Sequence, residues 1–391
     1  MTQTQPTPPL EGIRVLDLSR ALAGPYCTMM LADAGADVLK VEALSGDDSR
    51  GWLPIAERAG VRESAYFLSV NRGKRSVRLD LKSPEGAARL RDLAARADVL
   101  VENFRPGLLD RLGLGPANLR DANPRLVTLS ITGFGSGGPD GHRPGFDQIV
   151  QAEAGLMSLV GEPDGEPTRV GLPIADLLAG MFGAYGVSLA LRHRDLTGRG
   201  GQVDTSLLAA VVGVHAFQGA GWLTAGVEPR RTGNRHPSVA PYGTFRCADA
   251  ELVIAVGSES LWRRFSAVVG LDPNREDIAT NARRVAVADQ LEAEIDVALA
   301  DWTASEVLAA LDQAGVPAGR IRSIPEVYAW EQVRHLGLVH ELIHSELGRV
   351  GVPGPALMMN GVPMASNLAP PVLGDHDNHV DDIWPSDKEH A

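Results

Sequence analysis

The sequence predicts an α/β protein with an open, mostly parallel sheet in a large domain and a smaller α+β domain. Three observations predict it. Strand and helix patterns alternate over residues 1–135, the 391 residues are too many for one ordinary core, and the composition changes near residue 229. Hydrophobic residues make up 44% of the chain and charged residues 22%, which is typical of a globular protein.

Short aliphatic runs bounded by turn residues predict the buried strands. They occupy residues 13–19, 37–42, 76–81, 98–104 and 125–133. Helices lie between them. One begins at Gly24 and Pro25, and another is capped by Ser83 with Pro84 at its first position. Ligands of such sheets bind beyond the carboxyl ends of the strands.

Composition also indicates where the domains divide. Apolar helices are expected over residues 176–194 and from Ser206, and the run 206–226 is expected to be a buried helix rather than a membrane span. The stretch 229–241 is rich in Pro, Arg and His, which marks a boundary. We expect a large domain over residues 1–225, a small α+β domain over 226–324, and a segment 325–391 that returns to the large domain.

Charge and cysteine content narrow the partners. Lys and Arg number 37 against 49 Asp and Glu, so the net charge of −12 disfavours binding to nucleic acid or an anionic membrane. A polyanionic ligand therefore needs a local basic patch. Two cysteines, Cys27 and Cys247, fit a reducing compartment, and the N-terminus resembles no targeting segment. We expect a cytoplasmic protein.

The stretch "GFGSGG" at residues 133–138 matches the dinucleotide-binding pattern G-x-G-x-x-G. That pattern requires a helix to begin at once, because the helix N-terminus faces the pyrophosphate. Prolines and glycines follow instead, at Pro139, Gly141, Pro144 and Gly145. The context favours a glycine-rich loop beside a ligand over NAD binding.

Two polar stretches leave alternatives open. The basic run 71–82 is either a solvated strand or a seat for phosphates, and "ENFRPG" from Glu102 offers ligand contacts at a strand end or simple turn chemistry. The tail 373–382 carries His376 and His379 among aspartates. Without a cysteine or a third histidine nearby, we expect a solvated acidic tail and no metal.

Asp176 precedes an apolar helix and is by default its N-cap. On a helical wheel, however, Gly180 and Gly183 share its face. Each interior glycine costs about 0.5–1 kcal/mol against alanine, so another backbone or a ligand is expected to approach that face closely.

Long motifs in a fixed order resemble those of the class III CoA-transferases, which include carnitine and bile-acid CoA-transferases and 2-methylacyl-CoA racemases. They include "LEGIRVLDLSRALAGPYCTMMLADAGADVLKVE", "FLSVNRGKRSVRLDL", "DVLVENFRPGLLDRLGLG", "PIAD", "AGVPAGRI" and "PPVLGDH". The resemblance covers Leu10 to about His376. It implies a Rossmann-like large domain, a smaller domain and an interlocked homodimer, with coenzyme A or acyl-CoA as substrate and no permanently bound cofactor.

The same resemblance assigns roles to single residues. The aspartate of "PIAD", Asp176, would be the nucleophile, forming first an acyl anhydride and then a CoA thioester. Backbone N–H groups of residues 133–138 or 233–238 would stabilise the oxyanions. The matching CoA contacts would be Ala23, Leu79, Asp80, Leu81, Lys82, Asn103, Phe104 and Arg111.

Within the family, "RALAGPYCT" and "HPSVAPYGTF" look most like the branch that moves CoA among dicarboxylates such as succinate and glutarate. A second carboxylate needs a cation, for which chemistry alone offers Arg20, Arg231, Arg235 and His236. Racemases carry a histidine where this chain has Phe146, which disfavours racemisation, although Asp147 is retained. The racemase, an NAD-dependent oxidoreductase and a non-catalytic CoA-binding dimer remain alternatives.

Overall fold

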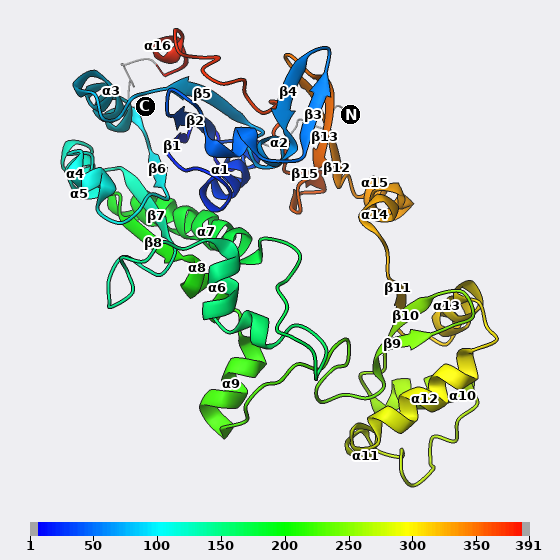
Figure 1. The fold of residues 1–391 in the computed structure, drawn as a ribbon. Coiled ribbons are helices and arrows are strands. Elements are labelled where there is room, and N and C mark those ends of the chain that lie inside the picture. The colour runs from blue at the N-terminus through cyan, green and yellow to red at the C-terminus, as the bar shows by residue number, and fades with distance from the viewer. Residues whose placement is uncertain (1–6, 385–391) are drawn as a thin grey trace. The chain divides into compact units, whose positions relative to one another are not determined.

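The computed structural model describes residues 7–384 and divides into two compact units (Figure 1). The first unit runs to Leu156, resumes at Arg169–Glu228 and continues from Glu331. The second comprises Met157–Thr168 and Pro229–Trp330. Residues 157–168, which we had placed in the large domain, belong to the second unit, where the Arg231 side chain donates to the backbone carbonyls of Glu162 and Gly165.

A six-stranded parallel sheet forms the centre of the first unit, which confirms the predicted fold class. Its order is β5-β2-β1-β6-β7-β8, so the chain moves outward from β1 and then returns to its other side with β6. The strands are β1 (Arg14–Asp17), β2 (Asp37–Glu42), β5 (Lys74–Arg78), β6 (Val99–Glu102), β7 (Val127–Thr132) and β8 (Gln202–Ser206). The sequence did not predict β8, because its polar residues lack an aliphatic run.

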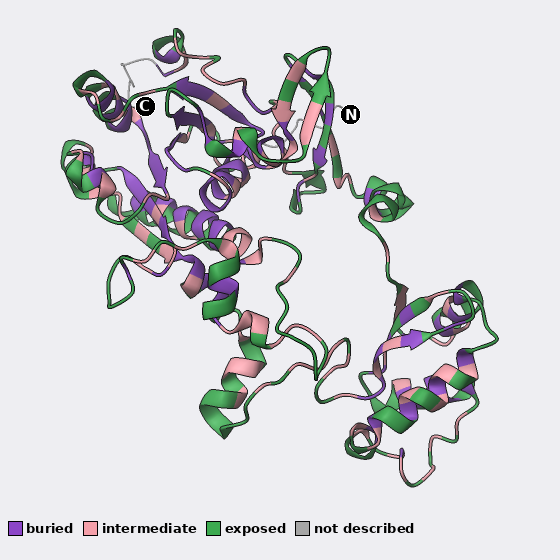
Figure 2. Ribbon diagram, in the orientation of Figure 1, coloured by how far each residue is buried: buried purple, intermediate pink, exposed green. Residues whose placement is uncertain are grey.

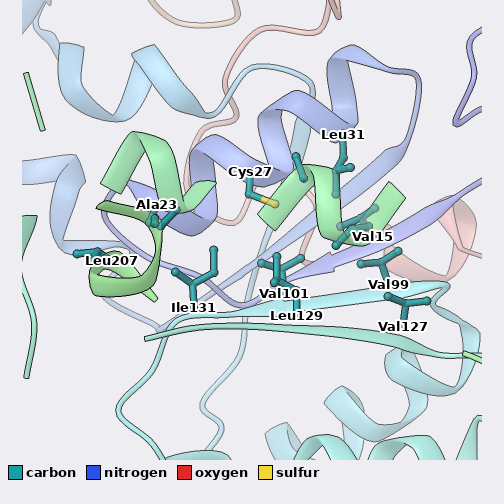
Figure 3. Close-up of a cluster of buried hydrophobic side chains, with 14 of the residues drawn as sticks. Val15, Ala23, Cys27, Leu31, Val99, Val101, Val127, Leu129, Ile131 and Leu207 are labelled. Carbon is teal, nitrogen blue, oxygen red and sulfur yellow. The ribbon is translucent and has the colours of Figure 1, made fainter. Parts of the chain in front are cut away.

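Helices cover both faces of the sheet. One face packs against α1 (Ala23–Asp33), α6 (Asp147–Glu153), α7 (Ile174–Thr197) and α8 (Leu207–Gly213). Figure 3 shows this core, where Cys27 and Leu31 of α1 lie over the strand residues Val15, Val99 and Leu129. The other face packs against α3 (Pro84–Arg96), α4 (Leu108–Arg111), α5 (Pro116–Ala122) and α16 (Val380–Ile383). Ser83 caps α3 as predicted, accepting a hydrogen bond from the Gly86 amide.

The chain beyond Glu331 completes the first unit. After α15 (Glu331–His335) it forms the antiparallel hairpin β12 (Val339–His344) and β13 (Gly348–Pro353), then β14 (Met358–Met359) and β15 (Val362–Pro363). The first hairpin shares a small apolar cluster with α2 (Ala65–Val70) and the hairpin of β3 (Ile55–Arg58) and β4 (Val61–Ser64). The acidic tail is docked through ion pairs of Asp377 with Arg78 and of Asp381 with Arg89, while Asp375, Asp381 and Asp382 remain exposed as expected.

The second unit is α+β. A three-stranded antiparallel sheet of β9 (Tyr242–Arg246), β10 (Glu251–Ala255) and β11 (Ala318–Arg320) packs on helices around Trp262 and Phe265. The helices are α10 (Glu259–Val269), α11 (Asn281–Ala286), α12 (Ala288–Leu299), α13 (Ala304–Gln313) and α14 (Ile324–Ala329). Strands β9 and β10 pair as an antiparallel hairpin.

The apolar run 206–226 is not the single buried helix that we expected. It forms α8 and α9 (Ala216–Ala225), bent by 76° at Val214–His215, and α9 has no buried residue (Figure 2). The helix breaks where Ala216 takes a φ of 48°. Among the described residues, α7 alone is long and apolar enough by itself to cross a membrane, but it packs in the core against α1 and the sheet.

Close packing explains the glycines of α7. A Cβ at Gly180 would lie 2.6 Å from the Ala23 carbonyl oxygen, and one at Gly183 would lie 3.0 Å from a methyl of Leu129. The expected close approach is therefore real, and α1 makes it at Gly180 and β7 at Gly183.

This packing gives a testable prediction. Gly180→Ala should lower the free energy of unfolding by about 1–2 kcal/mol, although alanine favours a helix by about 1 kcal/mol, because the clash is with backbone that cannot move freely. Gly221→Ala in α9 is the control, since a Cβ there meets open space. Chemical denaturation of both variants measures the difference, and equal stability for the two would contradict the packing argument.

Candidate active site

A cavity of about 630 Å³ opens where the order of the sheet reverses, beyond the carboxyl ends of β1 and β6. This is where open α/β sheets bind their ligands. The loop after β1 and the loop after β6 form one side of the cavity, and Asp176 in the first turn of α7 lies in its lining. The cavity therefore brings together five of the residues predicted from sequence, which are Arg20, Ala23, Asn103, Phe104 and Asp176.

Asn103 joins the two loops. Its side-chain oxygen accepts from the Arg20 amide at 2.8 Å, and its amide nitrogen donates to the Arg20 carbonyl at 2.8 Å. The Asn103 side chain thus satisfies both the backbone N–H and the backbone carbonyl of Arg20. In this position Asn103 is more than a turn former.

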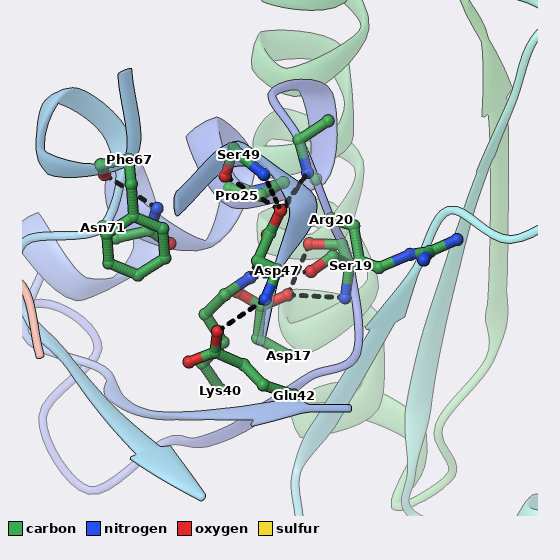
Figure 4. Close-up of polar contacts among 12 residues, drawn as sticks. Asp17, Ser19, Arg20, Pro25, Lys40, Glu42, Asp47, Ser49, Phe67 and Asn71 are labelled. Carbon is green, nitrogen blue, oxygen red and sulfur yellow. Dashed lines mark hydrogen bonds and ion pairs between the residues drawn. The ribbon is translucent and has the colours of Figure 1, made fainter. Parts of the chain in front are cut away.

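Buried charges hold the rest of the β1–α1 loop (Figure 4). The Lys40 ammonium donates to the Ser19 carbonyl at 2.8 Å, and Asp17 accepts from the Ser19 amide at 2.9 Å. Asp47 accepts from the Ala21 amide at 3.2 Å and pairs with Lys40 at 2.9 Å. Residues 19–21 therefore have their backbone fixed beside the cavity.

Asp176 does not cap its helix. Helix α7 begins at Ile174 with Pro173 as N-cap, and Asp147 of α6 supplies the missing acceptor. One oxygen of Asp147 accepts from the Ala175 amide at 2.8 Å and from the Asp176 amide at 3.4 Å. The carboxylate of Asp176 is thereby left free to face the cavity.

Gln151, one turn after Asp147 in α6, extends this support. It is fully buried and donates to the other oxygen of Asp147 at 2.7 Å. Its carbonyl oxygen accepts from the Val170 amide at 2.9 Å, and its amide donates to the Leu172 carbonyl at 3.3 Å. Helix α6 therefore holds the whole segment from Val170 to Asp176 in place.

Burial and then the nearby charge of Asp147 raise the pKa of Asp176 to about 7. A position in the first turn of a helix favours the charged form of a carboxylate, but desolvation outweighs that effect here. Tyr66 of α2 also lines the cavity, and burial followed by the charge of Asp176 raises the pKa of its hydroxyl. No ion pair holds Asp176 among the residues that the structure describes.

The cavity also contains further arginines, of which sequence reasoning had singled out Arg105 in ENFRPG and missed Arg143 and Arg169. Besides Arg20 it is lined by Arg105, Arg143 and Arg169. Arg143 pairs with Glu153 and lies over the ring of Phe134. Arg169 donates to the carbonyls of Val170 and Gly171 at 3.2 and 3.1 Å. No motif marks Arg143 and Arg169, because only the fold brings them to the cavity.

Two further hollows adjoin this cavity, and Arg105 and Pro106 line all three. One, of about 370 Å³, is lined by Arg111, Gly137 and Gly138. The other, of about 240 Å³, lies over the ends of β6, β7 and β8. The remaining predicted contacts, Leu79 to Lys82, follow β5 at the same carboxyl edge of the sheet.

Residues 71–77 of the basic run are largely internal, so this part is neither a solvated strand nor an open seat for phosphates. Four of its cations pair with aspartates of the same unit, namely Arg72 with Asp33, Lys74 with Asp17, Arg75 with Asp37 and Arg78 with Asp377. Lys82 is exposed and takes part in no ion pair among the described residues.

The candidates for reading a second carboxylate fall into different units. Arg20 lines the cavity, but it pairs with Asp48 at 3.5 Å and lies over the Phe104 ring. The others belong to the second unit. Arg231 donates to carbonyls there, Arg235 pairs with Glu292 and Asp289, and the ring of His236 stacks on Tyr242.

The glycine stretch opens no helix, as the sequence predicted. No helix lies between Gly133 and Asp147, and Gly133 and Gly145 cross so closely that a Cβ on either would lie 2.5 Å from the other. Both line the cavity. Within residues 7–384, no group of three His, Cys, Asp or Glu side chains is arranged to hold a metal ion.

Comparison with known proteins identifies the family. A family model described as CoA-transferase family III matches residues 10–377. The chain belongs to CoA-transferase family III. The succinate–glutarate CoA-transferase of Agrobacterium fabrum is 41% identical over 95% of each chain. The succinyl-CoA:glutarate CoA-transferase of Mus musculus is 39% identical over 95% of this chain and 85% of its own.

Solved structures of the family agree with this fold. A CAIB/BAIF family protein from Brucella suis superposes with a TM-score of 0.85 and is 38% identical, over 94% of this chain and 97% of its own. The sequence resemblance to class III CoA-transferases is therefore confirmed.

Burial of Asp176 in this family III fold predicts an unusual dependence of stability on pH. The folded pKa of about 7 exceeds the unfolded value of about 3.9, so the folded state alone keeps the proton between these values. Stability must then fall as pH rises through that window. Asp176→Asn should remove this fall in stability. The difference in free energy of unfolding between the variant and wild type should therefore grow in favour of the variant by a few kcal/mol between about pH 5 and about pH 8.

Denaturant unfolding at the two pH values measures this advantage. Asp147→Asn is the matched variant, because asparagine still accepts from the Ala175 amide but removes the like charge. It should lower the folded-state pKa of Asp176, so that the pH range over which stability falls becomes narrower but does not disappear. A constant stability difference between Asp176→Asn and wild type would contradict the raised pKa.

Proposed function

We propose that this family III enzyme transfers CoA from succinyl-CoA to a second dicarboxylate, with Asp176 as the nucleophile. The observation that carries the proposal is the Asp176 carboxylate, which lines a cavity at the switch point of the sheet and has no cationic partner within residues 7–384. Its raised pKa marks a poorly solvated and hence strongly nucleophilic carboxylate once the proton has left. The names of the relatives support the same substrates.

The chemistry proceeds in four balanced steps. The Asp176 carboxylate attacks the thioester carbonyl of succinyl-CoA, forming a mixed anhydride and releasing the CoA thiolate. The thiolate attacks the aspartyl carbonyl, which gives an aspartyl-CoA thioester and frees succinate. The carboxylate of the acceptor attacks this thioester and releases the thiolate again. The thiolate then attacks the acceptor carbonyl of the new anhydride, which yields the new acyl-CoA and regenerates the Asp176 carboxylate.

The adjoining hollows support a path for CoA. Because Arg105 and Pro106 border all three, a long ligand extends from Arg111 to Asp176 without leaving the cleft. We assign the contacts of this ligand to Ala23, Leu79, Asp80, Leu81, Lys82, Asn103, Phe104 and Arg111. Of these, Lys82 and Arg111 supply the positive charge that phosphates require.

The glycine loop at Gly133 is the better of the two candidate oxyanion sites. Gly133 lines the cavity of Asp176, whereas residues 233–238 belong to the second unit. Phe146 lies in the same lining, where a racemase would need a histidine, so the cavity favours acyl transfer over α-proton transfer.

We further propose the interlocked homodimer and a cytoplasmic location. Apolar side chains exposed on the single chain run along α7 and continue on α9, which supports an interface between copies. They include Met181, Phe182, Tyr185, Leu189, Trp222 and Leu223. The two cysteines are free and buried, which suits a reducing compartment.

Mass spectrometry tests the activity directly. Incubation with succinyl-CoA and a panel of acids, including glutarate, oxalate and mesaconate, should give new acyl-CoA species with at least one dicarboxylate. Hydroxylamine added during turnover should modify Asp176, and Asp176→Ala should lose at least about a thousandfold in rate. Asp48→Ala, an exposed acid in the same lining, is the control.

Three outcomes would overturn this proposal. No new acyl-CoA with any acid would favour a CoA-binding dimer, and deuterium exchange at the α-carbon without acyl transfer would favour a racemase. Full activity of Asp176→Ala would exclude it as the nucleophile.

The interlocked dimer makes a separate prediction. Light scattering should give twice the mass of one chain. Two differently tagged forms, mixed when folded, should yield no hybrid, because linked chains separate only on unfolding; hybrids should form after joint refolding. A monomer, or rapid exchange between folded dimers, would contradict the interlock.

A further inference from the structure

Resting on the proposed function, we propose that Arg169 binds the distal carboxylate of the dicarboxylate and so sets the specificity of the enzyme. The residue was not among the sequence candidates. It lies seven positions before Asp176 and lines the same cavity.

The four arginines of the cavity differ in what already occupies them. Arg20 faces Asp48, and Arg143 is held by Glu153 and by the Phe134 ring. Arg105 borders all three hollows, which places it along the path proposed for CoA.

Arg169 is the remaining one. Its guanidinium donates through a single nitrogen to the carbonyls of Val170 and Gly171, and no carboxylate pairs with it in residues 7–384. Its other N–H groups remain available for a bidentate contact with a carboxylate.

Hydrogen bonds hold the backbone between Arg169 and Asp176 in place. The distance from Asp176 at which Arg169 binds a carboxylate is therefore limited. Gln151 holds Val170 and Leu172, and Asp147 holds Ala175. Both clamps come from α6, so Arg169 and Asp176 are attached to one rigid support. A diacid bound with one carboxylate at Asp176 would meet a cation at a defined distance.

In the proposed reaction one cation is able to serve both substrates. Donor and acceptor acyl groups are attached to Asp176 in turn, so their free carboxylates extend from the same atom into the same cavity. A residue on the same support as Asp176 is therefore well placed to bind either one.

A comparison of acids that differ only in the distal group tests the proposal. The ratio of kcat/KM for glutarate to that for pentanoate is measured with succinyl-CoA as donor. In Arg169→Gln the value for glutarate should fall roughly ten- to hundredfold, while that for pentanoate stays within about threefold. KM for succinyl-CoA should rise as well. Arg169→Lys should recover part of the loss, since it keeps the charge but not the fork.

Arg143→Gln is the matched control, because it removes a cavity arginine that Glu153 already occupies, and it should leave the ratio unchanged. Thermal unfolding of each variant confirms that it folds. An equal fall for both acids, or no fall for glutarate, would overturn the role of Arg169 while leaving the transferase activity established. Wild-type enzyme that transfers CoA to no acid would overturn the proposed function and this inference with it.

Discussion

The site depends on the way in which buried charges hold the loop between β1 and α1. Removing Lys40 and Asp47 from water is costly, and such pairs often contribute little net stability. Here they determine geometry, since the Lys40 ammonium fixes the Ser19 carbonyl and Asp47 fixes the amide of Ala21, whose φ is 64°. That backbone conformation is unfavourable for alanine, and it persists because the charges beneath it and Asn103 beside it leave no alternative.

Asp176 shows the opposite electrostatic situation in the same unit. Burial raises the pKa of Asp17, but the ammonium groups of Lys74 and Lys40 outweigh it and hold that pKa below its usual range. Asp176 is buried without such a cation among the described residues, and the charge of Asp147 adds repulsion. The interaction that fixes the start of α7 therefore also makes Asp176 harder to ionise. Nothing in the packing of the helix requires this cost, which is what distinguishes a reactive carboxylate from a structural one.

Most of the fold, but only part of the candidate site, could be predicted from the sequence. Aliphatic runs predicted five strands of the sheet, and capping residues predicted the starts of helices. Strand β8 was not predicted, because it is an edge strand and contains no aliphatic run. Ala23, Asn103 and Asp176, which the motifs singled out, line one cavity. The motifs could not show that Arg72 and Lys74 are internal, because their partners Asp33 and Asp17 are far away in sequence. For the same reason the sequence could not show that Asp147 caps α7, and it predicted Asp176 as the N-cap of that helix.

The contrast between the buried and exposed cations suggests how substrate range changes within such a fold. Lys40 and Lys74 are fully buried, so replacing either would leave a partner carboxylate unpaired in the core and would endanger the loop that they support. Arg169 is exposed and bonded only to local carbonyls, so its replacement should cost the fold little. An exposed cavity residue such as Arg169 can therefore be replaced in enzymes that act on a different acid, while Asp176 and the helix that supports it stay the same. Separation of the two roles is what allows one scaffold to act on different acids.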